Sequence, residues 1–259
     1  MSEGLSPSAL PTLPVGLAGA LEPLAEVWVY LAATPLFGLT LTLGAYVIAE
    51  RLSARSGRHP LANPVLWSVL AIIAVLAATG TPYRRYFEGA QFVHFLLGTA
   101  TVALAVPLAR LWPELRSRAG SLLLGLVIGA AVSIAVALGS AELLGASALL
   151  KASLLPKSVT APIAMGIAER VGGSATLAAV FAVTTGIVGA LVVTPLLNAM
   201  GVRDWAARGF ALGLAAHGIG TARAWSVHPR AGAYASLAMG LHGVLAALLL
   251  PWLAHWLLV

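Results

Sequence analysis

The sequence predicts an all-α polytopic integral membrane protein with about eight membrane elements. Of its 259 residues, 59% are hydrophobic and only 9% are charged, and the mean hydropathy of +0.94 is far above that of soluble domains. Uncharged runs also recur along the chain, and all but the run 209–222 are near or above the ~20 residues that cross the hydrocarbon core of a bilayer. These runs cover residues 27–49, 59–83, 89–109, 119–141, 171–202, 209–222 and 231–259.

The chain is expected to begin with a weakly structured lead-in over residues 1–23, which lacks the basic segment of a signal peptide. Residues 24–259 are then a single integral membrane domain, because the loops between spans are too short for a separate folded unit. Arginines follow the first long span and glutamates precede it, so the positive-inside rule puts the N-terminus outside. If all eight elements cross fully, both termini lie outside.

A weak internal repeat is present at a spacing of about 60 residues. Residues 157–161 align with residues 217–221, and the apolar segment 185–193 aligns with 242–250. A fainter third copy begins at Gly98, and the predicted repeat-like units cover residues 91–144, 149–200 and 206–258.

Each unit reads as a small, polar, interrupted segment followed by an apolar span, which is typical of a transporter core. Two topologies stay open at this point. If the interrupted segments cross fully, neighbouring copies point the same way, as the arginine distribution favours. If the segments are re-entrant, the one span between them inverts the second copy.

The segment 154–165 carries the strongest functional signal. Pro156 and Pro162 interrupt a helix among residues apolar enough for a membrane, and Lys157 stands between them. An ammonium at the bilayer centre costs about 2.5–3.5 kcal/mol and requires a compensating group. No carboxylate is near in sequence, so we expect a ligand's anion to balance it. The alternative is a lysine that snorkels to the surface or pairs with Glu169.

Hydroxyl groups accompany the lysine. Ser158 and Thr160 could orient a polar ligand, or they could cap the broken backbone. Thr99 and Thr101 occupy comparable places in the first unit, although threonine in membrane helices commonly bonds to its own preceding turn.

The last unit brings several polar groups together. His217 could bind a carboxylate or exchange a proton, or it could be a hydrogen bonder that packs helices. Gly218 and Gly220 permit an unwound turn, and Thr221 adds a hydroxyl. Arg223 could hold a carboxylate in a bidentate pair, or anchor the chain at the interface beside Trp225.

Several function classes are excluded. The chain has no cysteine and no HExxH, Walker or GxSxG motif, and acids within the spans are too scarce for paired-carboxylate catalysis. We therefore expect no enzyme, no cofactor and no metal site. The net charge of +6 lies mostly in short loops, so nucleic acid is not an expected partner.

The chain resembles the LrgB/CidB family of bacterial membrane proteins, whose plant relatives include the plastid glycolate/glycerate translocator. The resemblance covers most of the chain from about residue 60. It rests on residues 153–165, on residues 185–190, on residues 207–209 with 216–224, and on residues 100–108. The family pattern has proline where this chain has Thr99, and often an acidic residue where it has Gly166.

The resemblance implies a multi-pass protein of the bacterial cytoplasmic (inner) membrane and one of two functions. The first is a carrier of small monocarboxylates such as glycolate, glycerate or pyruvate, in bacteria often acting with a small LrgA-type membrane partner. The alternative is a holin- or antiholin-like regulator of murein hydrolase activity and cell lysis. The residues favour an alternating-access carrier that binds the anion between the 156–162 break and the 217–221 segment. The spacing of Gly125 and Gly129 also predicts a possible homodimer surface.

Overall fold

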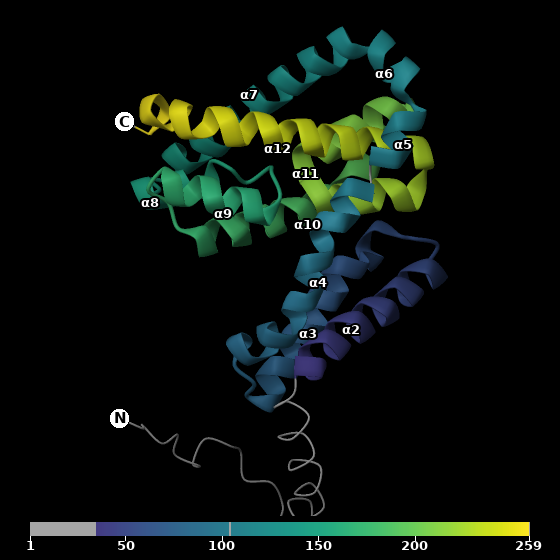
Figure 1. The fold of residues 1–259 in the computed structure, drawn as a ribbon. Helices are drawn as coiled ribbons and strands as arrows, with labels where there is room; N and C mark the ends of the chain where they lie inside the picture. The colour runs from purple at the N-terminus through teal and green to yellow at the C-terminus, as the bar shows by residue number, and fades with distance from the viewer. Residues whose placement is uncertain (1–34, 104, 259) are drawn as a thin grey trace, which may run out of the picture.

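The structure is a computed structural model that describes residues 35–103 and 105–258. All regular elements of this described part are helices (Figure 1). The predicted lead-in over residues 1–23 lies outside the described residues. The elements are α2 (Pro35–Arg55), the 3₁₀ turn η2 (Pro60–Ala62), α3 (Pro64–Thr79), α4 (Tyr83–Ala103), α5 (Ala105–Arg110), α6 (Trp112–Ser117), α7 (Ala119–Leu143), α8 (Ala148–Leu154), α9 (Ala161–Arg170), α10 (Ala175–Ala199), α11 (Trp205–Val227) and α12 (Pro229–Leu257).

The described residues contain four helices that are long and apolar enough to span a bilayer, namely α2, α7, α10 and α12. The helix α3 is apolar but has only 16 residues. The sequence placed spans over 119–141, 171–202 and 231–259, and α7, α10 and α12 fall within a few residues of these ranges. The expected count of eight membrane elements is not confirmed.

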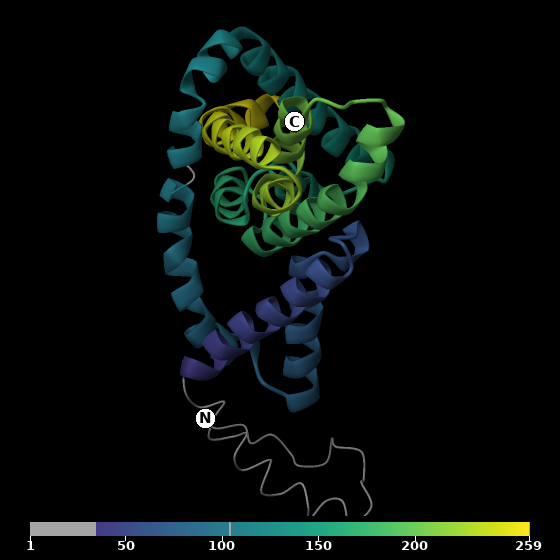
Figure 2. The same cartoon turned by 90° about the vertical axis from the view of Figure 1, so that its right-hand side faces the viewer.

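The N-terminal helices α2, α3 and α4 pack together on one side of the molecule (Figure 1). A Cβ on Gly38 would stand 2.1 Å from the carbonyl oxygen of Tyr86, so only glycine allows α2 and α4 to approach this closely. The side chain of Asn63 caps the start of α3, and Gly80 ends that helix in the left-handed conformation. From α4, the chain arches through α5 and α6 to α7 (Figure 2).

The segment between α7 and α10 does not cross the bundle. At about 1.5 Å per residue, α8 with 7 residues and α9 with 10 residues are each too short to span a bilayer. The loop 155–160 joins them, and α9 returns to the end from which α8 began. The start of α10 packs against α8, since the backbone N–H of Ser174 donates to the Ser153 hydroxyl at 2.8 Å, and Lys151 of α8 pairs with Glu142 at the end of α7. We call residues 148–170 hairpin 1.

The helix α11 also reverses direction, because Ala216 and His217 have non-helical backbone angles and His217 has φ of +40°. Its two arms, residues 205–215 and 218–227, lie side by side. A Cβ on Gly220 in the second arm would stand 2.8 Å from the Leu212 carbonyl oxygen in the first. The rings of Trp205 and His228, at opposite ends of α11, are stacked 4.8 Å apart. We call residues 205–227 hairpin 2.

The contacts of the two arms with α12 confirm the reversal. In the first arm, Gly209 and Gly213 approach Ala231 and Ala235, so the residue numbers rise together and this arm runs parallel to α12. In the second arm, Trp225 bonds to Ser236 while the earlier residue Thr221 contacts the later Met239, so this arm runs antiparallel.

The hairpins enter the bundle from opposite ends, and their turns meet near its centre. Hairpin 1 packs against the C-terminal half of α12, where α9 shares a buried cluster with Leu250 and Ala254. Hairpin 2 packs against the N-terminal half of α12. In Figure 1, α8 and α9 lie at the end where α12 finishes, and α6 lies at the end where it starts. This answers the topology question in favour of re-entrant segments.

The second and third predicted repeat units share an order of elements. Each has an interruption, then a helical stretch, and then a long helix that contains a proline. In the second unit these are residues 155–160, the stretch ending at Arg170, and α10 with Pro195. In the third unit they are residues 216–217, the stretch ending at Val227, and α12 with Pro251. Each hairpin starts and ends at the same end of the bundle, and α10 crosses the bundle between them. The third unit is therefore oriented opposite to the second. The first unit differs, since α4 continues as a helix through Gly98 to Ala103. The repeat itself stays a prediction.

Candidate functional site

Lys157 lies where hairpin 1 reaches the middle of α7, and its amine contacts hydroxyls instead of a carboxylate. The Nζ atom donates to Ser133 Oγ at 3.3 Å and to Ser158 Oγ at 3.2 Å. These two hydroxyls are themselves hydrogen-bonded at 2.7 Å. Within the described residues, no carboxylate oxygen forms an ion pair with Lys157.

The other lysine of the chain has the opposite environment. Lys151 lies at the base of hairpin 1, and its Nζ contacts Glu142 Oε2 at 2.6 Å. The alternative pairing of Lys157 with Glu169 is absent from the ion pairs of the described residues. Glu169 lies near the end of α9, on the far side of that helix from the turn. Of the two lysines, Lys157 is thus the one whose charge lacks an acidic partner in the described structure.

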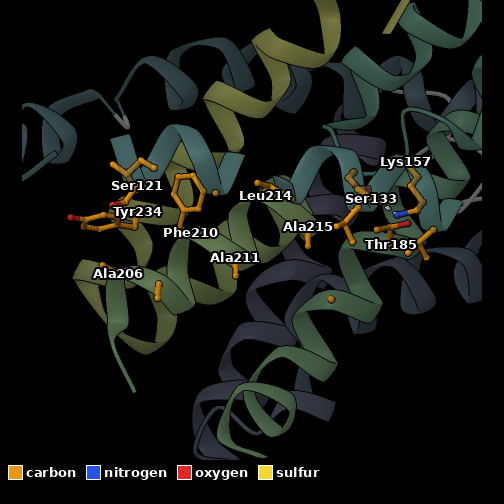
Figure 3. Close-up of a pocket in the computed structure, with 18 of the residues that line it drawn as sticks. Ser121, Ser133, Lys157, Thr185, Ala206, Phe210, Ala211, Leu214, Ala215 and Tyr234 are labelled. Carbon is orange, nitrogen blue, oxygen red and sulfur yellow. Dashed lines mark hydrogen bonds between the residues drawn. The ribbon is translucent and has the colours of Figure 1, made fainter. Parts of the chain in front are cut away.

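Lys157 opens into a cleft of about 950 Å³ between α7, α10 and hairpin 2 (Figure 3). At one end of this cleft, Lys157, Ser133 and Thr185 lie close together. Its middle is lined by apolar side chains such as Leu214 and Ala215. Thr184 and Ser158 also line the cleft, and Ser158 is one of the two hydroxyls that contact the ammonium.

The other end of the cleft is a charged cluster at the start of α12. Glu114 of α6 accepts hydrogen bonds from the Tyr234 hydroxyl, at 2.7 Å, and from Arg230. The Tyr234 hydroxyl, together with Arg230, holds the pKa of Glu114 below its usual range. Arg118 links this cluster to Asp204 at 3.9 Å, and both Arg118 and Asp204 line the cleft. Hairpin 2 is therefore tied to α6 and α7 at this end.

The predicted residues His217 and Thr221 are buried in hairpin 2 and do not line the cleft with Lys157. His217 Nε2 is hydrogen-bonded to the Ala182 carbonyl oxygen of α10 at 2.8 Å. Thr221 donates to the His217 carbonyl oxygen at 2.7 Å, which satisfies a backbone group at the turn. This is the packing alternative that the sequence left open for a membrane histidine.

The remaining predicted binding residues lie apart from Lys157. Thr160 occupies the N-cap of α9, where its side chain makes no capping hydrogen bond. Arg223 is in the second arm of hairpin 2 and donates to the Arg58 carbonyl oxygen at 2.7 Å, which joins this hairpin to the N-terminal helices. Thr99 and Thr101 are within α4, and their side chains lie outside the described residues.

The predicted helix-breaking residues have different positions. Pro156 is fully buried in the loop 155–160, and Pro162 lies in the first turn of α9, where a proline needs no helical donor. In hairpin 2 the break is at Ala216 and His217 and not at the glycines. Gly218 and Gly220 follow in the second arm, and Gly220 allows the two arms to approach closely.

Sequence reasoning missed Ser133 and Thr184, and gave Thr185 and His242 no binding role. Ser133 could have been found, because it extends the Gly125 and Gly129 pattern by one further step of four residues on α7. The glycine pair faces α11 of the same chain, since a Cβ on Gly129 would stand 2.9 Å from the Leu214 side chain. It therefore gives no support to a homodimer surface.

The fold and the cleft define a multi-pass membrane protein built around two re-entrant hairpins. The model of the LrgB-like family matches residues 42–256, and the chain belongs to this family. Together with the apolar helices, its bacterial relatives indicate a multi-pass protein of the cytoplasmic membrane.

Three relatives illustrate the similarity. The chain is 30% identical over 222 residues to "Holin-like protein CidB" of Staphylococcus epidermidis, covering 86% of this chain and 96% of the relative. It is 29% identical over 213 residues to "Holin-like protein CidB" of Staphylococcus aureus, covering 82% and 93%. It is 33% identical over 220 residues to "Uncharacterized protein YxaC" of Bacillus subtilis, covering 84% and 95%. No solved structure matches the chain.

Proposed function

We propose that this protein carries a small monocarboxylate across the membrane by alternating access. The observation that supports the proposal is the ammonium of Lys157 in the loop of hairpin 1. It lies beside the middle of α7, where it contacts two serine hydroxyls and no acidic partner among the described residues. A charge at the bilayer centre costs about 2.5–3.5 kcal/mol, and neutral hydrogen bonds recover part of that cost. A carboxylate entering the cleft would supply the missing countercharge.

The composition of the cleft favours a small anion with one charge. A single ammonium matches a single carboxylate, and the neighbouring apolar side chains would make a second charge costly. The hydroxyls of Ser133, Ser158 and Thr185 would bind the carboxylate or the hydroxyl or keto oxygen beside it. This supports the glycolate, glycerate or pyruvate class that the sequence resemblance implies.

The hairpins offer a route for alternating access. Their turns meet near the depth of Lys157 and enter from opposite ends, so a movement of each hairpin would open the site toward a different face. Corresponding interrupted segments of this kind are a feature of transporter cores. The small LrgA-type partner implied by the resemblance and a homodimer both stay predictions.

A holin-like function is the second candidate, and the names of the relatives favour it over a carrier. Two of the relatives are called holin-like proteins. In that function, helices would associate to permeabilise the membrane or to regulate such a lesion. The exposed apolar faces of α2 and α7 would be available for association. Expression would then release cytoplasmic contents, without saturable uptake of any acid.

Counterflow in proteoliposomes separates the two candidates. Purified protein is reconstituted with an excess of unlabelled two- or three-carbon acid inside, and entry of the labelled acid is followed. We expect wild-type protein and Lys151→Ala to show saturable counterflow and Lys157→Ala to lose most of it. Because Lys151 already has an acidic partner, it is the matched control. Absence of counterflow in the wild type, together with leakage of an entrapped dye, would favour the holin-like function.

A further inference from the structure

His242 is a titratable group at the centre of the bundle that the proposed carrier does not yet use. It lies in the middle of α12 and is 5% exposed. Its Nδ1 is 3.0 Å from the carbonyl oxygen of Leu214, which precedes the turn of hairpin 2. A carbonyl oxygen can only accept, so Nδ1 carries a hydrogen and the neutral ring has its lone pair on Nε2.

The Nε2 atom has no hydrogen-bond partner among the described residues. The ring lines a second pocket of about 190 Å³, which lies against the loop of hairpin 1. Ser133 and Ser158 line both this pocket and the cleft that contains Lys157. The imidazole is therefore separated from the proposed anion site by the two serines that bind Lys157.

His217, the histidine singled out from the sequence, is less suited to exchange a proton. Its Nε2 is held by the Ala182 carbonyl oxygen, and its ring packs against Gly186, where a Cβ would stand 2.8 Å from Cε1. Neither pocket beside Lys157 is lined by this ring.

The charges around His242 couple its protonation to the anion. Two titratable groups interact with it, Lys157 from hairpin 1 and His217 from hairpin 2. The facing residues of α7 contribute only the Ser133 hydroxyl, and among the described residues no carboxylate lines the pocket. Protonation of His242 would add a second positive charge beside Lys157. A bound carboxylate removes that repulsion, so each ligand strengthens the binding of the other.

The geometry points to His242 as the proton-binding residue of an anion–proton symporter. This inference rests on the proposed carrier function and adds the coupling ion to it. One proton on Nε2 and one carboxylate at Lys157 are bound together and released together, so the transported pair is neutral. Conversely, an empty site holds Lys157 alone, with His242 unprotonated.

The test uses full-length protein in liposomes with an acidic outside and a neutral inside. Wild type is expected to accumulate labelled pyruvate or glycolate above the outside concentration, and a protonophore is expected to abolish the accumulation. His242→Asn keeps a donor near the Nδ1 position but cannot take up a proton. It is expected to lose the accumulation, and its counterflow at equal pH is expected to fall but to stay measurable, because Lys157 still binds the anion. His255→Asn, the same change at an exposed position of α12, is the control.

The outcomes separate the two claims. If wild type shows no counterflow, the carrier function itself is wrong. If counterflow occurs but His242→Asn accumulates acid like wild type, or the gradient has no effect on wild type, only the proton-coupling inference is overturned. A pH dye trapped inside wild-type liposomes gives a second readout that needs no variant. Addition of the acid should acidify the lumen faster than in protein-free liposomes.

Discussion

A cysteine pair at positions 205 and 228 tests the reversal of α11, on which the proposed site depends. The chain has no native cysteine, so Trp205→Cys with His228→Cys introduces the only thiols. A straight helix of 23 residues would separate its ends by about 34 Å. In the structure the rings at these positions are stacked 4.8 Å apart. We therefore expect a short bis-maleimide to join the two cysteines within one chain.

The matched control is Ser174→Cys with Met200→Cys, which flank the 25-residue helix α10. That helix has no reversal, and its ends are about 37 Å apart at helical rise. Cross-linking is read as protection of both thiols from a later labelling reagent, measured by mass spectrometry of intact protein. If the 205–228 pair reacts no more than the control pair, α11 crosses the membrane as one helix and the meeting of the two hairpin turns is wrong.

Three further predictions concern the site and its surroundings. Removing the hydroxyl with Ser133→Ala should lower the apparent affinity for glycolate, relative to that for acetate, by a few-fold in competition counterflow, since a hydrogen bond contributes about 0.5–1.5 kcal/mol. Equal losses of affinity for both acids would argue against a role of Ser133 in selectivity. Gly186→Ala places a Cβ 2.8 Å from Cε1 of His217 and should lower the free energy of unfolding by about 1–3 kcal/mol, whereas Gly139→Ala, with open space around it, should not. A Gly186→Ala variant as stable as wild type would contradict the packing at the hairpin turn. Because the pKa of Glu114 lies below its usual value of 4.5 in the folded protein, its charge stabilises the fold above that pH and the benefit is lost as the pH falls toward the folded pKa. The gap in melting temperature between wild type and Glu114→Gln should therefore shrink on acidification, and a gap that grows would refute the assignment.

The sequence predicted the long helices well because hydropathy and length determine them. The predicted span 119–141 corresponds to α7, and 171–202 contains α10. The count of eight was not confirmed, since an apolar run does not reveal whether its chain crosses or turns back. The run 209–222 reads as a span, yet it contains the reversal at Ala216 and His217.

The arginine distribution was misleading for the same reason. With the N-terminus outside and eight full crossings, the positive-inside model puts Arg208 outside and Arg223 inside. The re-entrant geometry brings both arms of hairpin 2 to one end of the bundle, where Arg208 contacts Asn198 and Arg223 contacts Arg58. A charge count assigns a side to each loop only after the number of crossings is known.

The site could be predicted in part. Lys157 and Ser158 are adjacent in the chain, and their chemistry is visible in a single segment. Ser133 and His242 come from other helices, and their approach depends on the packing of α7 and α12 against hairpin 1. His217 carried the more conspicuous motif, but the turn of hairpin 2 directs its ring at the backbone of α10.

Direct binding of a small acid to the purified protein tests the central claim most closely, because it requires neither a gradient nor a partner protein. Losing a charge-assisted contact costs about 1.5–3 kcal/mol, so Lys157→Ala should bind labelled pyruvate or glycolate about 10- to 150-fold more weakly than wild type. Lys151→Ala should bind like wild type. Equal binding by wild type and Lys157→Ala would contradict the account.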